Sequence, residues 1–368
     1  MRIVILADPL DNQRAGIHYY TQNLIRELGQ IDKEDEYYII RRKKDDLFPA
    51  GRQIVVRNHR FPGYAALRMF YLIPRRIRKL DADIVVEPAH FGPFNLPKKI
   101  KRVTVIHDLT PILFPKLHRF HSQLLQRIFL KSILRRAALI ITNSENTARD
   151  VKDFIPSASD RTISIYLGKD ESIKYTKISF DEFKELRGKD YFLFTGTIEP
   201  RKNLECLLDA FKIYKDQSRS EQMLVIAGQQ GWKIKSFFNR LKDHPYRKDI
   251  FLTGFVPREV MSSMYSNATS FIFPSLYEGF GLPVVEAMAC GTPCLISDTS
   301  SLPEVGGDAA LYFKPGEAET LAALMQKIVS DPQGRKELSE KAIQQAEKFS
   351  WRSHALSFDK AIKKLYHS

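Results

Sequence analysis

Residues 273–293, FPSLYEGFGLPVVEAMACGTP, decide the fold. A short apolar run predicts a strand that ends at about Pro274, and a compact loop with Gly279 and Gly281 follows it. Pro283 suits the first turn of a helix, where its missing N–H has no partner to lose. A strand, a glycine loop and a helix in this order form the repeating unit of parallel α/β sheets.

The same stretch carries groups that can bind a sugar nucleotide. The free amides at the start of the predicted helix, between Gly281 and Pro283, form an anion site that suits a diphosphate. Glu278 lies in the loop and Glu286 in the first turns of the helix. Both carboxylates can therefore face one ligand and accept hydrogen bonds from the vicinal hydroxyls of a ribose or hexose. The alternative is a capped helix in which Glu286 only complements the helix dipole.

Strand and helix patterns alternate over the whole chain. In the first half, strands are predicted at Arg2–Ala7, Tyr37–Ile40, Ile54–Val56, Ile84–Glu87, Val103–Ile106, Leu139–Asn143 and Thr162–Tyr166, and helices at Ile17–Leu28, Phe120–Ala137 and Thr147–Phe154. In the second half, strands are predicted at Tyr191–Thr195, Met223–Ala227, Ile250–Thr253, Ser270–Pro274, Pro293–Ser297 and Ala310–Phe313, and helices at Asn203–Asp216, Arg258–Ala268, Pro283–Ala289, Glu317–Ser330, Gln333–Phe349 and Arg352–Tyr366. The alternation predicts an α/β protein with parallel, doubly wound sheets.

The chain is long enough for two domains of moderate size, with 368 residues. The stretch Leu167–Asp190 is polar, and its one helical pattern is at Phe180–Leu186. We therefore predict a first Rossmann-like domain over residues 1–168, a connection over 169–190 and a second over 191–351. Ligands of such sheets bind beyond the carboxyl ends of the strands, so a cleft between two facing domains is the expected site.

Composition narrows the partners and the compartment. There are 57 basic and 43 acidic residues, a net charge of +14, which favours nucleic acid, an acidic membrane surface or a phosphorylated substrate. Three cysteines, Cys206, Cys290 and Cys294, form no disulfide framework or metal cluster, so we expect buried thiols in a cytoplasmic protein. Neither a secretory signal nor an apolar stretch of about 20 residues is visible.

The segment GTIEPRKN at 196–203 follows another predicted strand. Arg201 and Lys202 are adjacent cations at a strand-to-helix turn that opens on Asn203, where they can neutralise a phosphate leaving group. A basic turn in solvent is the alternative. Metal-independent stabilisation of the leaving group is the expectation, because no strong metal cluster is visible.

Two features of the first half are weaker. Ala15–Gly16 lies in the first strand-to-helix loop without a GxGxxG pattern, which argues against a dinucleotide oxidoreductase. The glycine still lets the backbone approach a phosphate, although an ordinary turn explains it equally well. His107–Asp108 ends the predicted strand Val103–Ile106 and would point into the cleft. The alternative is a structural histidine paired with its neighbour.

Two basic stretches mix Arg and Lys with large apolar residues: HRFPGYAALRMFYLIPRRIRKL at 59–80 and KLHRFHSQLLQRIFLKSILRR at 116–136. This composition is typical of an interfacial helix at an anionic membrane surface. An ordinary helix with a solvated basic face is the alternative. Nucleic acid is not an expected partner, because no RNA- or DNA-binding motif is present.

Through EGFGLPVVEAMACGTP and GTIEPRKN the chain resembles the retaining GT-B glycosyltransferases of family 4, from its first strand to its C-terminal helices. HDLTP at 107–111 is similar to the mannosyltransferase-rich branch. The resemblance implies that residues 352–368 cross back to brace the first domain, after a turn at Trp351. Many members have a basic residue where this chain has Thr197, and Gly-Gly where it has Ala15–Gly16.

The resemblance also implies roles. Glu286 would hold the donor's ribose hydroxyls, and Glu278 would contact the transferred sugar. Lys202 and Arg201 would hold the diphosphate, and His107 would lie beside the sugar's distal hydroxyls. The remaining donor-binding positions are in the two glycine loops and after the strand-end glycine: Gly16, Thr197, Gly279, Phe280, Gly281, Leu282 and Pro283.

The function implied is transfer of mannose from GDP-mannose, with retention, to a glycan on a lipid carrier in surface polysaccharide synthesis. The donor would thus be a nucleoside diphosphate sugar, and no cofactor is expected. A peripheral position on the inner face of a membrane would fit the basic stretches. A UDP-sugar donor, a nucleotide-sugar epimerase and a non-catalytic sugar-nucleotide- or nucleic-acid-binding protein remain as alternatives.

Overall fold

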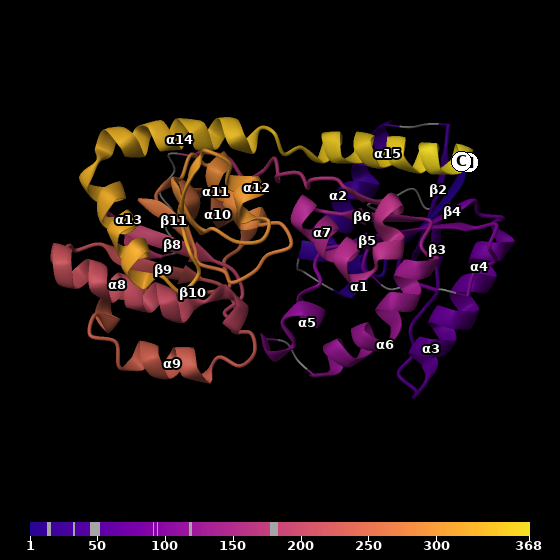
Figure 1. Cartoon of the computed structure of the whole chain (residues 1–368), viewed down its shortest axis with the longest axis horizontal. Coiled ribbons are helices and arrows are strands. Elements are labelled where there is room, and N and C mark those ends of the chain that lie inside the picture. The colour runs from indigo at the N-terminus through magenta and orange to yellow at the C-terminus, as the bar shows by residue number, and fades with distance from the viewer. Residues whose placement is uncertain are drawn as a thin grey trace. The chain divides into compact units, whose positions relative to one another are not determined.

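The computed structural model describes residues 1–12, 16–31, 34–44, 52–90, 92–93, 95–117, 120–176 and 183–368, excluding the side chains of residues 12 and 120–127. The chain forms two compact units (Figure 1). The first consists of Met1–Gly168 with Trp351–Ser368, and the second of Lys169–Ser350. Each unit is an α/β domain with a parallel sheet, as predicted.

The first unit contains a seven-stranded sheet in the order β3-β2-β1-β4-β5-β6-β7. The strands are β1 (Arg2–Leu6), β2 (Glu36–Arg41), β3 (Gln53–Val55), β4 (Ile84–Glu87), β5 (Lys101–Ile106), β6 (Leu139–Thr142) and β7 (Thr162–Ser164). The inner strand β1 pairs with β2 through Ile5 and Ile39 and with β4 through Ile5 and Val86. Its apolar residues are buried because helices cover both faces of a parallel sheet.

Helices of the first unit connect these strands. They are α1 (Pro9–Asn12), α2 (Gly16–Ile31), α3 (Tyr64–Leu67), η2 (Arg68–Leu72), α4 (Ile73–Lys79), α5 (Thr110–Leu113), η3 (Pro115–Leu117), α6 (Phe120–Arg136), α7 (Glu145–Phe154), η4 (Pro156–Arg161) and the C-terminal α15 (Trp351–His367). α15 packs on α2, where the Tyr20 ring makes edge-on contacts with the rings of Trp351 and His354. The buried face of α15 also includes Phe358 and Ile362.

The second unit contains a six-stranded sheet in the order β10-β9-β8-β11-β12-β13. The strands are β8 (Tyr191–Thr195), β9 (Met223–Ala227), β10 (Ile250–Gly254), β11 (Ser270–Phe273), β12 (Cys294–Ser297) and β13 (Ala310–Phe313). Its helices are η5 (Lys184–Leu186), η6 (Pro200–Lys202), α8 (Leu204–Ser218), α9 (Lys235–Lys242), η7 (Arg247–Asp249), α10 (Arg258–Ser266), α11 (Leu282–Ala289), α12 (Leu302–Gly306), α13 (Ala318–Ser330) and α14 (Pro332–Ala346).

The strand order of the second unit reverses between β8 and β11. The chain runs outward from β8 to β9 and β10 on one side, and from β11 to β12 and β13 on the other. Ligands of such sheets bind beyond the carboxyl ends of the strands at this switch point. The loops that follow β8 and β11 are Gly196–Asn203 and Pro274–Gly281, the two that the sequence motifs singled out.

Some predicted elements differ from the structure. Gly16 is predicted to lie in the first strand-to-helix loop, but it begins α2, and Pro9–Asn12 between β1 and α2 forms α1. Ala15 and the first part of the helix predicted at Phe180–Leu186 lie outside the described residues, and Lys184–Leu186 forms a 3₁₀ turn. In the part of the chain that the structure describes, no helix is long and apolar enough to span a membrane.

Candidate active site

The loops after β8 and β11 are tied together by their backbones. The amide of Leu276 donates to the carbonyl of Arg201 at 2.8 Å. On the other side, the loop after β9 packs so closely that a Cβ on Gly228 would lie 1.9 Å from the carbonyl oxygen of Gly196. The turn after β8, which is predicted to bind the diphosphate, is therefore held between the loops after β9 and β11. Little room is left for a side chain at Gly228.

Arg201 and Lys202 both bind Glu278. Lys202 Nζ lies 2.7 Å from Glu278 Oε1, and Arg201 Nη1 lies 2.6 Å from Oε2. Arg201 also donates to the carbonyl of Tyr277, while its Nη2 lies 2.8 Å from Glu199 Oε1. The ammonium of Lys202 lies over the Phe273 ring, 4.5 Å from the centroid. Three of the predicted site residues thus form one buried ionic cluster, and Glu199 is a member that sequence reasoning missed.

The cluster keeps Glu278 ionised. Burial alone would raise the pKa of Glu278, but Arg201 and Lys202 lower it to about 2. Burial also lowers the pKa of Lys202, and the charge of Glu278 opposes that change. The charged pair is therefore the form that fits this geometry, because each partner stabilises the charge of the other.

Glu286 belongs to a second cluster on the same unit. Arg258 Nη2 donates to Glu286 Oε1 at 2.9 Å, and the Tyr265 hydroxyl donates to Oε2 at 3.1 Å. Arg258 also binds Asp170 Oδ2 through Nε at 2.6 Å. Tyr265 in turn lies 2.8 Å from the hydroxyl of Thr195, the last residue of β8. Glu286 is therefore linked both to the switch point and to the segment that begins the unit.

Burial raises the pKa of Glu286, and the charge of Arg258 acts in the opposite direction. Arg258 thus favours the ionised form, which accepts hydrogen bonds from hydroxyl groups. Sequence reasoning missed Arg258 and Tyr265. The available signal was that the α10 helix opens with an arginine directly after the β10 strand and Pro257, at the edge of the sheet where ligands bind.

The start of α11 is fixed by its neighbours. Gly281 caps the helix at φ +116°, a left-handed conformation that favours glycine. Ser301 Oγ donates to the carbonyls of Glu278 and Phe280 at 3.0 and 2.8 Å. The Phe280 ring packs edge-on against Phe349, with the ring centroids 5.6 Å apart. Leu282 and Pro283 form the first turn, so the helix begins within one residue of the predicted start, and the Val284 amide donates to the Gly281 carbonyl at 2.9 Å.

His107 belongs to the first unit, at the end of β5. Its Nε2 donates to the carbonyl of Pro88 at 2.8 Å, and its backbone amide donates to Nε2 of His90 at 2.8 Å. Burial lowers the pKa of His107, which favours the neutral ring with an acceptor at Nδ1. Asp108 Oδ1 accepts from the amide and hydroxyl of Thr110, which fixes the α5 turn.

The remaining predicted positions are separate from the ionic clusters. Thr197 is exposed after the strand-end glycine, and Gly16 opens α2 in the first unit with nothing within 4 Å of an added Cβ. The three cysteines are free and buried, as expected. Across the described ranges, no group of His, Cys, Asp and Glu side chains has the arrangement of a metal site.

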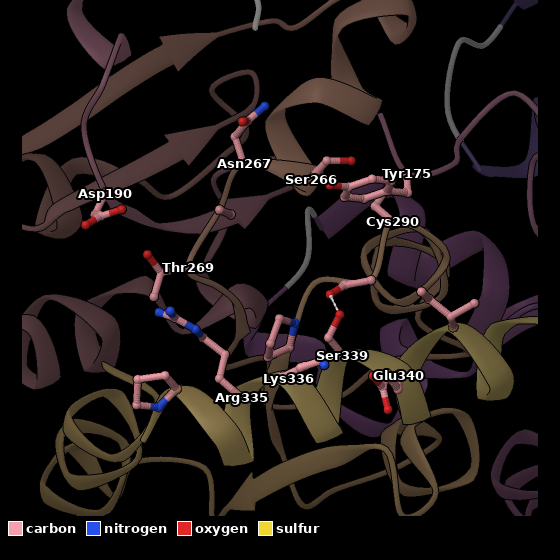
Figure 2. Close-up of a pocket in the computed structure, with 15 residues that line it drawn as sticks. Tyr175, Asp190, Ser266, Asn267, Thr269, Cys290, Arg335, Lys336, Ser339 and Glu340 are labelled. Carbon is pink, nitrogen blue, oxygen red and sulfur yellow. Dashed lines mark hydrogen bonds between the residues drawn. The ribbon is translucent and has the colours of Figure 1, made fainter. Parts of the chain in front are cut away.

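A hollow of about 590 Å³ lies elsewhere on the second unit (Figure 2). Arg335, Lys336 and Glu340 of α14 line it together with Asp190 and Thr269, and Arg335 extends toward Thr269. Asp190 and Thr269 directly precede β8 and β11, so the hollow lies at the amino ends of the strands. Because ligands of such sheets bind at the carboxyl ends, the ionic clusters mark the candidate site and this hollow does not.

Two family models match the chain. Residues 14–172 match Glycosyltransferase Family 4, and residues 176–348 match Glycosyl transferases group 1. The O-antigen chain mannosyltransferase B of Escherichia coli is 28% identical over 95% of this chain and 96% of its own length. The serotype-specific mannosyltransferase WbdA of Escherichia coli is 30% identical over 69% of this chain. The matched region covers 32% of the length of WbdA.

The fold occurs in solved glycosyltransferase-like structures. The Anabaena protein HepE, determined in complex with UDP-glucose, aligns with a TM-score of 0.74 over 99% of this chain and 100% of its own, at 17% identity. At that identity the likeness shows the fold alone. Both sheets of this chain therefore have counterparts in one known two-domain architecture.

Proposed function

Because the chain belongs to the glycosyltransferase family that these two models describe, with the GT-B fold, we propose that it transfers mannose from GDP-mannose to a lipid-linked glycan in O-antigen-type polysaccharide synthesis. Mannose is supported by the relatives, which are mannosyltransferases. The observation that carries the mechanism is the buried cluster of Arg201, Lys202 and Glu278 at the switch point of the second sheet.

The proposed roles follow from charge and position. Lys202 and Arg201 stabilise the negative charge that develops on the departing diphosphate, with the amides at the start of α11. Glu286, held by Arg258 through Oε1, accepts hydrogen bonds from the ribose hydroxyls. Glu278 contacts the sugar that is transferred, and the neutral His107 accepts from its distal hydroxyls. Stabilisation by fixed cations needs no divalent metal, so EDTA should leave turnover unchanged.

A donor screen tests the nucleotide. Thermal unfolding is measured with GDP, UDP and ADP, each with its common sugars, because a ligand that binds the folded state raises the melting temperature by mass action. GDP and GDP-mannose are expected to give the largest shifts. A larger shift with UDP-glucose, with which the HepE structure was determined, would replace the GDP assignment with a UDP donor.

A product assay tests the reaction. The donor identified in the screen is incubated with and without lipid-linked glycan, and the product is examined by NMR. We expect sugar transfer only with the glycan and an α-linkage from an α-linked donor, which is retention. Conversion of the donor without any acceptor would favour an epimerase, and inversion of the linkage would contradict the proposed stereochemistry.

The surface of the first unit around β3, α3 and α4 supports a lipid-linked acceptor. A hollow of about 430 Å³ is lined by Val55, Val56, Arg57, Tyr64, Tyr71, Leu72, Arg75, Arg76 and Lys79. Its four cations form no ion pair with any residue that the structure describes. Phe61, Leu67 and Tyr71 nearby are 56%, 44% and 55% exposed. Unpaired cations beside exposed apolar side chains fit an anionic membrane surface.

Vesicle co-sedimentation tests this surface. The double variant Arg75→Glu, Arg76→Glu should lose binding to vesicles that contain anionic phospholipid. The matched control is Arg335→Glu, Lys336→Glu, which makes the same change of charge beside the hollow of the second unit. Equal losses in both variants would indicate a non-specific effect of net charge, and equal binding of the wild type to neutral vesicles would contradict the proposal.

A further inference from the structure

The cations that the donor diphosphate needs are already bound to a carboxylate of the protein. Both oxygens of Glu278 are engaged, one by Lys202 at 2.7 Å and one by Arg201 at 2.6 Å. A diphosphate that binds the same cations meets a full negative charge at contact distance. Its binding must therefore share these donors with Glu278 or displace its side chain.

We propose that Glu278 is an internal competitor of the diphosphate, and that donor binding transfers its carboxylate from Lys202 and Arg201 to the sugar that is transferred. This inference rests on the proposed function and deepens it. No covalent bond is made or broken in the exchange. Hydrogen bonds from an ammonium and a guanidinium to a carboxylate are replaced by equivalent bonds to phosphate oxygens.

The backbone of Glu278 is anchored independently of its carboxylate. Its backbone amide donates to Ser300 Oγ at 2.9 Å, and its carbonyl accepts from Ser301 Oγ at 3.0 Å. The backbone is thus fixed by the residues in front of α12, while only the side chain bridges to the cations. The exchange therefore involves the side chain of Glu278 and leaves its backbone in place.

Glu199 is a second carboxylate of the same cluster, and its contacts differ from those of Glu278. It binds the opposite edge of Arg201, with Nε at 3.1 Å and Nη2 at 2.8 Å, and it lies in the same turn of the chain. Arg201 can therefore keep its orientation when Glu278 leaves. Among the described residues, Glu199 has no ion pair with Lys202, so it competes at neither the Lys202 ammonium nor the Nη1 edge of Arg201. The two carboxylates carry the same charge in the same cluster, but only Glu278 binds Lys202 and the Nη1 edge of Arg201.

The test compares Glu278→Gln with Glu199→Gln, using inorganic pyrophosphate as a probe that is independent of base and sugar. Affinities are measured by calorimetry. Removal of a competing charged partner should tighten pyrophosphate binding by about tenfold in Glu278→Gln. Glu199→Gln controls for the general electrostatic effect of losing one negative charge, and it should change the affinity much less. The same order is expected for the nucleoside diphosphate identified in the donor screen.

Two results would overturn the inference. One is an unchanged or weaker affinity in Glu278→Gln, including no detectable binding in either this variant or the wild type. The other is equal tightening in the two variants. Should Glu278→Gln fail to fold, Glu278→Asp keeps the charge on a side chain too short to bridge both cations and should tighten binding by a smaller factor. If GDP and GDP-mannose do not bind, the donor assignment fails, and the pyrophosphate series still decides the exchange.

Discussion

Replacement of Lys202 by methionine probes the proposed charge stabilisation directly. The ammonium is buried, contacts Glu278 at 2.7 Å and lies over the Phe273 ring. Methionine keeps an apolar stem of similar length in the same place and removes only the charge. The substitution therefore separates the electrostatic role of Lys202 from its packing.

The structure sets the size of both effects. Removing one partner of a buried ion pair usually costs about 3–5 kcal/mol of unfolding free energy. Here Arg201 remains 2.6 Å from Glu278, so the carboxylate keeps a cation, and we expect a loss of about 1–3 kcal/mol. Loss of a preorganised group that stabilises developing negative charge lowers kcat by about 100- to 1000-fold, or about 2.7–4 kcal/mol.

The assay is release of nucleoside diphosphate from the donor in the presence of the glycan acceptor, at a temperature where the variant is fully folded. Lys212→Met is the matched control, because Lys212 is an exposed lysine of the following helix that pairs with Asp216 at the surface. An exposed pair of this kind contributes about 0.3–0.5 kcal/mol, so turnover in the control should match the wild type.

A folded Lys202→Met variant with a kcat within about threefold of the wild type would refute the reasoning, because it would leave less than about 1 kcal/mol for the charge. The pattern of kinetic constants matters as well. A rise in KM at constant kcat would mean that Lys202 binds substrate and transition state equally. The proposed role requires that kcat itself falls.

Three further predictions address other residues of the candidate site. Arg258→Met should weaken donor binding more at lower pH than at higher pH, because Glu286 without the guanidinium protonates at higher pH. Calorimetric affinities over a pH series that parallel the wild type would contradict this. Gly281→Ala should lower the free energy of unfolding by about 1 kcal/mol or more, since φ is +116° and the new Cβ would lie 3.0 Å from Leu302 Cδ2. Gly29→Ala in α2, where an added Cβ has nothing within 4 Å, should not lower it in the same urea titrations. The pKa of Glu278 is lowered from 4.5 to about 2, so its charge contributes stability that is complete above pH 4.5 and is lost as the pH falls through 2. The free energies of unfolding of the wild type and Glu278→Gln, measured in urea, should therefore converge over that range. A constant difference would refute the ionised assignment.

The strands were predictable because the sheets are parallel and covered on both faces. Tyr191–Thr195 and Ser270–Phe273 are wholly buried, so each appears in the sequence as a short apolar run between polar loops. α9 (Lys235–Lys242) was not predicted, because its short, charged sequence KSFFNRLK buries only Phe237 and Leu241. α12 (Leu302–Gly306) is a single turn and carries no periodic signal.

The site was predictable where local chemistry specifies it. Glycine, proline and charge in fixed order identify Glu278, Lys202 and the start of α11 before any contact is known. The partners of these residues were not predictable, because Glu286 meets Arg258 and Asp170 only through the packing of segments far apart in the chain. The pairing of His107 with Pro88 has the same cause, since it depends on β4 and β5 being neighbours in the sheet.

The charge balance of the two clusters gives an independent reason to expect the exchange of Glu278. Glu199 and Glu278 together neutralise Arg201 and Lys202, and Asp170 and Glu286 outweigh Arg258. A site with this balance offers no excess of cations to a diphosphate. Buried ion pairs of this kind are also a poor source of stability compared with apolar packing. A cluster that holds two cations in place, and can release them when one carboxylate rotates away, is the arrangement that makes such burial useful to a transferase.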